Sequence, residues 1–217
     1  MKLVIFDFDG TLGDTRRNII ITMQQTMKEL GLEIADEASC AATIGLPLEA
    51  CFRQLYPELD DAGILSCAAT YRRIFEDNKK KLKPQLFPHV AETLQWLYDQ
   101  GHTLTVASSR SAASLHEFLK DMAIDKYISY VLGADNVEHA KPHPEPVLKT
   151  LAALGIAAAD ALVVGDMPVD IMMGASAGVA TCGVTYGNAS REQLKQAHAN
   201  DIIDDMAELK DVIASRK

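Results

Sequence analysis

Two carboxylates stand where a strand should end near the start of the chain. The stretch VIFDFDGTL, residues 4–12, places Asp7 and Asp9 directly after an apolar run that predicts a buried strand. Side chains two positions apart in a strand project to the same side, so both carboxylates would lie together at its carboxyl end. Two like charges persist there when a cation, a hydrogen-bond network or a shared proton compensates them. A solvated acidic turn would also explain the pair, so the rest of the chain must decide.

Polar residues also follow three later predicted strands, at about residues 103–108, 127–132 and 161–165. These residues are Ser108, Ser109, Arg110, Lys141, Asp166 and Asp170. Each could merely cap a helix or solvate a loop, but ligands bind at the carboxyl edge of such sheets, where all of them would meet. Together they suit phosphoryl transfer: one carboxylate attacks phosphorus, the other moves a proton, and a hydroxyl and an ammonium bind phosphate oxygens. The clustered carboxylates require a dication, and hard oxygen ligands favour Mg²⁺.

The elements that must position these groups follow two patterns. Residues 15–80 carry apolar residues at helical spacing, with no alternating strand pattern. The later part of the chain alternates near-continuous apolar strands with helices, which predicts a doubly wound parallel sheet covered on both faces. We therefore expect an α/β core domain formed by residues 1–13 and 84–217, with an all-helical insertion at residues 14–83.

The composition of the chain limits the kinds of partner that it could bind. The chain of 217 residues is 48% apolar and 24% charged, as in ordinary globular proteins. A net charge of −9 and the lack of a Lys/Arg stripe argue against nucleic acid and anionic membranes, and no apolar run approaches the roughly 18 residues of a membrane span. Its four cysteines show no metal-site spacing. We expect free thiols in a cytoplasmic protein whose partner is a small phosphate ester, and a homo-oligomer is left open.

Four motifs occur in a characteristic order along the chain. They are DFDGT at 7–11, the hydroxyl of Ser108, KPHPEP at 141–146 and GDMPVD at 165–170. With these motifs the chain resembles the haloacid dehalogenase (HAD) superfamily and, over nearly its whole length, the phosphoglycolate phosphatase group. The resemblance implies a Rossmann-like HAD core, and the helical insertion is similar to the family's cap, whose loop at residues 43–47 would face the substrate.

The resemblance also implies roles for the matched residues. Asp7 would be the nucleophile and Asp9 the general acid and base, and Mg²⁺ would be held by the Asp7 carboxylate, the Asp9 carbonyl and Asp166. The other expected site residues bind the phosphate or support the site. The phosphate-binding residues are Thr11, Ser108, Ser109 and Lys141, and the supporting residues are Asp170, Arg110 and Gly45.

The expected function is Mg²⁺-dependent hydrolysis of a small, phosphoglycolate-like phosphate monoester through an aspartyl-phosphate. Ser109-Arg110 stands where phosphoglycolate phosphatases often have Asn-Lys, which leaves the catalytic set intact and puts only the substrate in question. A phosphosugar mutase of the β-phosphoglucomutase type would share Asp7 and Asp9 and differ mainly in the cap, so it stays an alternative. A non-catalytic phosphoacceptor domain is less favoured, because such domains are shorter and need no helical insertion.

Overall fold

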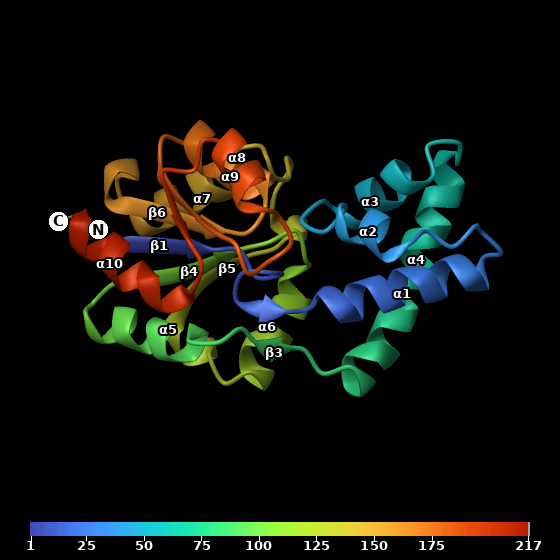
Figure 1. Cartoon of the computed structure of the whole chain (residues 1–217), viewed down its shortest axis with the longest axis horizontal. Coiled ribbons are helices and arrows are strands. Elements are labelled where there is room, and N and C mark those ends of the chain that lie inside the picture. The colour runs from blue at the N-terminus through green and yellow to red at the C-terminus, as the bar shows by residue number, and fades with distance from the viewer. Residues whose placement is uncertain (217) are drawn as a thin grey trace.

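Short apolar segments form the sheet at the centre of the molecule (Figure 1). The computed structural model describes residues 1–216. In spatial order the strands are β5 (Ile128–Leu132), β4 (Thr103–Ala107), β1 (Leu3–Phe6), β6 (Ala161–Gly165), β7 (Ala180–Val184) and β8 (Asp201–Ile203). All neighbouring pairs are parallel. The expected α/β sheet is therefore confirmed, and β1 and β6 are buried along their whole length, as strands covered on both faces are.

Helices cover both faces of the sheet (Figure 1). One face carries α5 (Val90–Asp99), α6 (Ala112–Asp121) and α10 (Leu209–Ser215), and the other carries α7 (Glu145–Leu154), α8 (Pro168–Ser176) and α9 (Arg191–Gln196). Alternate residues of β1 serve the two layers: Val4 and Phe6 belong to the apolar cluster of the first face, whereas Leu3 and Ile5 belong to that of the second. Short 3₁₀ turns occur at Asp125–Tyr127, Ala134–Asn136, Ala158–Asp160 and Met206–Glu208.

Four helices between β1 and β4 in the sequence form a separate group, here called the helical group. They are α1 (Arg16–Glu29), α2 (Glu37–Ala41), α3 (Leu48–Leu55) and α4 (Asp61–Lys81). Asp60 starts α4 by accepting a hydrogen bond from the Gly63 backbone N–H at 2.8 Å, as an N-cap residue does. Figure 1 shows the helical group at the end of the sheet toward which β1 runs, so it lies beside the carboxyl edge of the strands.

The two connections between the helical group and the sheet lie side by side. Gly13–Asp14 (β2) pairs antiparallel with Gln85–Leu86 (β3), with Gly13 opposite Leu86. The sequence pattern did not predict this pair, nor strand β8, because segments of two or three residues are too short to show an alternation. Within the described residues 1–216, no helix is both long and apolar enough to cross a membrane.

Candidate active site

The carboxyl ends of β1, β4 and β6 bring the expected polar residues to one edge of the sheet. Asp7 directly follows β1, Ser108 follows β4 and Asp166 follows β6, and all three are buried. Gly165 allows α8 to begin close to this edge, because a Cβ at Gly165 would lie 2.3 Å from the Cβ of Asp170. The strand ends therefore meet where the sequence predicted a site.

Three carboxylates and one ammonium form the centre of this edge. One carboxylate oxygen from each of Asp7, Asp166 and Asp170 lies within 4.8 Å of the others. The Lys141 Nζ donates to Asp7 Oδ1 at 2.7 Å and to Asp170 Oδ1 at 2.6 Å, and its side chain is only 2% exposed. Asp170, which was expected to support the site, thus contacts Lys141.

Burial dominates the electrostatics of this cluster. It raises the pKa of Asp7 to about 7, a shift that Lys141 opposes and the nearby charge of Asp170 increases. Burial together with the charges of Asp170 and Asp7 raises the pKa of Asp166 well above its usual range. The pKa of Lys141 is raised despite its burial, because the carboxylates of Asp170 and Asp7 stabilise the ammonium form. The cluster therefore carries more acid groups than its single cation balances.

Asp166 also accepts hydrogen bonds from residues outside the carboxylate cluster. Its carboxylate accepts hydrogen bonds from the Thr11 hydroxyl at 3.2 Å, from the Asn188 backbone N–H at 2.7 Å and from Asn188 Nδ2 at 2.9 Å. Gly10 has φ of +82°, and a Cβ there would lie 2.2 Å from Asp166 Oδ2, so only glycine fits. The expected phosphate ligand Thr11 thus donates to Asp166, and Asn188 joins the site without having been predicted.

Asp9 is held apart from the carboxylate cluster. Its carboxylate accepts from the Arg110 Nε at 2.7 and 2.8 Å and from the Thr15 hydroxyl at 2.5 Å. Thr15 occupies the N-cap position of α1 but makes no side-chain capping bond, because its hydroxyl is turned to Asp9. Two carboxylates two residues apart therefore have separate surroundings, which allows them different chemical tasks.

The Arg110 side chain connects the helical group to the sheet. Its guanidinium carbon lies 5.0 Å from the ring centre of Phe75 in α4 and 4.8 Å from that of Phe118 in α6. Such contacts with aromatic faces stabilise a cation that is removed from water. Burial would lower the pKa of Arg110, but the charge and hydrogen bonds of Asp9, with smaller contributions from Tyr71 and Asp7, together outweigh burial. The pKa is therefore raised and the guanidinium stays charged.

The loop at residues 43–47 touches the sheet edge. The Ser109 hydroxyl donates to the Gly45 carbonyl at 2.6 Å, and Gly45 adopts φ of +97° beside Met167. Ser108 is buried, and its hydroxyl accepts a long hydrogen bond of 3.4 Å from the Arg110 backbone N–H. The phosphate-binding roles expected of Ser108 and Ser109 stay predictions.

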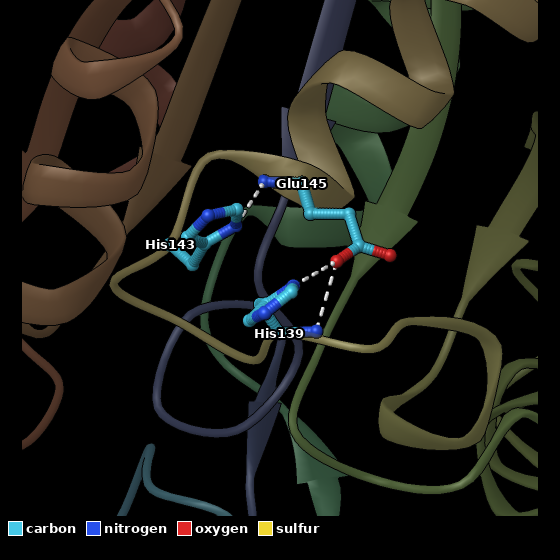
Figure 2. Close-up of side chains that lie close together, drawn as sticks. All are labelled: His139, His143 and Glu145. Carbon is cyan, nitrogen blue, oxygen red and sulfur yellow. Dashed lines mark hydrogen bonds and ion pairs between the residues drawn. The ribbon is translucent and has the colours of Figure 1, made fainter.

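The loop before α7 holds Lys141 in place through Glu145. The Glu145 carboxylate accepts from the backbone N–H groups of Glu138 at 2.9 Å and His139 at 2.8 Å, and Lys149 lies 2.9 Å from it. Figure 2 shows the carboxylate directed at His139, with the His143 ring near the Glu145 backbone. These bonds lower the pKa of Glu145, and the hydrogen bond from Lys149 has the largest effect. Glu145 is thus bound into both ends of a loop that contains Lys141.

A divalent cation fits the buried carboxylates better than the exposed group in Figure 2. Asp7, Asp166 and Asp170 offer hard oxygen atoms whose charge exceeds that of Lys141, which are the ligands that Mg²⁺ prefers. His139, His143 and Glu145 also lie within 4.8 Å of one another, but both oxygens of Glu145 already accept hydrogen bonds. The expected role of the Asp9 carbonyl as a metal ligand stays a prediction.

A cavity of about 700 Å³ lies between the helical group and the sheet edge. Much of its wall is apolar, and Asp9 and Arg110 also line it. The apolar lining residues include Ile19, Met23, Ile44, Leu46, Pro47, Leu48, Tyr71 and Phe75. Ligand pockets commonly have volumes of about 300–1,000 Å³, so the space is suited to a small molecule that reaches Asp9.

Known proteins similar to this chain point to one family. Residues 4–184 match the model of the haloacid dehalogenase-like hydrolases. A probable phosphatase IndB from Dickeya dadantii is 39% identical over 209 residues, which are 95% of this chain and 91% of that protein. A pyrophosphatase PpaX from Oceanobacillus iheyensis is 33% identical over 98% of this chain and 95% of its own. The crystal structure of a predicted phosphoglycolate phosphatase from Haemophilus somnus 129pt has a TM-score of 0.87 at 27% identity, covering 98% of both chains.

Proposed function

The chain belongs to the haloacid dehalogenase-like hydrolase family, and on that premise we propose that it is a Mg²⁺-dependent phosphatase of small phosphate monoesters. The observation that carries the proposal is the separation of two carboxylates: Asp7 lies with Lys141 among buried acids, whereas Asp9 lies with Arg110 at the cavity. The names of the similar proteins, a probable phosphatase and a pyrophosphatase, support phosphoryl transfer. Four free, buried cysteines fit the expected cytoplasmic location.

In the first half of the proposed reaction, a carboxylate oxygen of Asp7 attacks phosphorus and the ester oxygen leaves. Lys141 contacts Asp7 directly, so its ammonium can bind a phosphate oxygen at the place of attack. Asp9, in its carboxylic acid form, gives its proton to the departing alcohol oxygen. The products of this half are the alcohol and an aspartyl-phosphate on Asp7.

In the second half, the Asp9 carboxylate takes a proton from water, and the hydroxyl attacks the phosphorus bound to Asp7. The bond between phosphorus and Asp7 breaks, which restores the Asp7 carboxylate and releases inorganic phosphate. Mg²⁺ held by the carboxylates of Asp7 and Asp166 and by the Asp9 carbonyl would supply positive charge against the phosphate oxygens. Burial raises the pKa of Asp7 to about 7, so positive charge beside it favours the ionised nucleophile.

The helical group would act as the cap over the substrate, with residues 14–83 as its extent. The contact between Ser109 and Gly45 and the packing of Arg110 against Phe75 are the observations that support this. The expected phosphoglycolate-like substrate has support from the structural similarity to a predicted phosphoglycolate phosphatase. The size of the cavity and the pairing of its arginines favour a larger alcohol, so we propose a monoester phosphatase without a two-carbon acid as its required leaving group.

Trapping the covalent intermediate tests the proposal. We expect Asp7→Asn to abolish phosphate release while the protein stays folded, because the amide has nearly the same shape but does not attack phosphorus. Asp9→Asn should slow turnover by about 10²–10⁴-fold and, after rapid acid quench, leave a phosphoryl group on the peptide that contains Asp7. Detection of an isomerised sugar phosphate in place of inorganic phosphate would favour the mutase. Phosphate release by Asp7→Asn at the wild-type rate would refute the assigned nucleophile.

A further inference from the structure

The charges around the cavity leave no cation for an anionic leaving group. Among the described residues that line it, the cations are three arginines, and each is paired with a carboxylate: Arg110 with Asp9, Arg72 with Glu49, and Arg73 with Glu29. Additional acidic residues, Glu76 and Asp135, also line the space. A carboxylate such as that of phosphoglycolate would therefore have to compete for an arginine that already has a carboxylate partner.

The cavity is also much larger than a two-carbon acid. A glycolate leaving group has about five non-hydrogen atoms, which take up about 150 Å³ at the roughly 30 Å³ that a water molecule occupies in the liquid. The cavity measures about 700 Å³. A nucleoside of about 17 to 19 such atoms would take up about 510 to 570 Å³ on the same scale. The space therefore matches an alcohol that carries a ring rather than a short chain.

The wall offers contacts that suit a planar ring and hydroxyl groups. Tyr71 and Phe75 stack with their ring centres 5.7 Å apart and lie beside Ile44 and Leu46 in the wall. Arg110 lies over the Phe75 ring, so the two rings offer the cavity part of their apolar surface, against which an uncharged ring can pack. Ser111, the N-cap residue of α6, and Ser114, in its first turn, add hydroxyl groups to the lining. Apolar and hydroxyl contacts together are those that an uncharged sugar bearing a base would use.

We propose that the substrate is the phosphate monoester of an uncharged alcohol that carries a planar ring, of the class of the nucleoside 5′-monophosphates, and that the cavity binds this ring. The inference rests on the proposed phosphatase function and specifies its substrate class. Asp7 and Lys141 do not line the cavity, whereas Asp9 does. The phosphate would therefore lie in the buried cluster and the alcohol in the cavity, with its bridging oxygen near Asp9.

A series of substrates tested with the wild-type protein shows directly whether a ring in the alcohol is recognised. Phosphate release would be measured with Mg²⁺ for uridine 5′-monophosphate, ribose 5-phosphate, phosphoglycolate and p-nitrophenyl phosphate. We expect kcat/KM for the nucleotide to exceed that for ribose 5-phosphate at least about 10-fold, since apolar contacts as small as a methylene are worth about 10- to 200-fold. Phosphoglycolate should be poorer still. Equal or better hydrolysis of phosphoglycolate would overturn the substrate class while leaving the phosphatase function intact, whereas no release from any ester would refute the function itself.

A charged substitution in the cavity wall is a second, independent test of the proposed substrate class. Leu46→Lys should lower kcat/KM for the nucleotide at least about 10-fold and raise it for phosphoglycolate, because the half-buried wall then carries an unpaired cation. Leu65→Lys is the matched control, since Leu65 is 61% exposed on α4 and does not line the cavity. The control should match the wild type on both esters. Equal changes for both esters in Leu46→Lys would contradict a selective wall.

Discussion

Replacing Lys141 by Met removes the cation that contacts two of the three clustered carboxylates. The ammonium is 2% exposed and lies 2.7 Å from Asp7 and 2.6 Å from Asp170. Methionine is close in length and leaves little empty space, so the main effect is the loss of charge and of two hydrogen bonds. Asp7, Asp166 and Asp170 would then be buried without their ammonium partner, which is costly in free energy.

The size of this effect follows from the burial of the pair. Removing one partner of a buried ion pair typically lowers the free energy of unfolding by about 3–5 kcal/mol. For a chain of this length each kcal/mol shifts the midpoint of thermal unfolding by about 2–4 °C, which gives a decrease of about 6–20 °C. We therefore expect Lys141→Met to unfold well below the wild type when both are measured in chelator.

The loss should grow with pH. Burial raises the pKa of Asp7 to about 7 even with Lys141 present, and without the ammonium this pKa rises further. The folded variant then binds protons that the unfolded chain has lost, so its free energy of unfolding falls as the pH rises through this range. The difference from the wild type should therefore be larger at pH 8 than at pH 6.

Urea unfolding followed by circular dichroism at both pH values measures the difference. Lys2→Met is the control, because Lys2 is 71% exposed in its pair with Asp160 and such surface pairs contribute about 0–1 kcal/mol. A Lys141→Met protein within about 1 kcal/mol of the wild type at pH 8 would refute the electrostatic reasoning, because it would behave like the surface pair.

Two further predictions concern residues that hold the site in place. Asn188→Ala removes one donor to Asp166, so we expect a higher Mg²⁺ concentration for half-maximal activity with kcat at saturating Mg²⁺ within about threefold, measured by titrating the metal. Glu145→Gln weakens the bonds from the Glu145 side chain to residues 138 and 139, which lie before Lys141, and should raise KM several-fold with little change in kcat. His143→Ala, an exposed neighbour, should not; equal KM values for the two variants would contradict a bracing role for Glu145.

The central sheet could be predicted because its strands are uniformly apolar. Ala161–Gly165 forms β6 at the bounds that its apolar run indicated, and Thr103–Ala107 differs from the expected strand by one residue. Helix ends were marked by glycine, as at Gly155, which follows α7 with φ of +62°. The pairing of β2 with β3 was not predictable, since each strand has two residues and forms only where segments about 70 positions apart meet.

The site residues that could be predicted from the sequence are those that directly follow a predicted strand. Asp7 and Asp166 are of this kind, and the structure brings both into one cluster. Asn188 and Thr15 are not of this kind, because their roles depend on contacts across the fold. Asn188 donates a hydrogen bond to Asp166, which lies 22 positions earlier in the sequence. Thr15 occupies a helix N-cap position, where a hydroxyl is common, but donates to Asp9. The contact of Arg110 with Phe75 likewise joins two distant segments.

In the proposed reaction, the arrangement would separate the recognition of phosphate from the recognition of the alcohol. Asp7 and Lys141 lie in the buried cluster formed by the strand ends, whereas the cavity wall comes mainly from the helical group. Asp9 lies between the two regions, because it follows Asp7 by two residues and lines the cavity. We therefore expect that a change in the helical group can alter which alcohol binds without moving Asp7, provided that Arg110 and Thr15 still hold the Asp9 carboxylate. In the proposed reaction, Asp9 is thus the residue through which the fit of the alcohol would affect the rate of bond breaking.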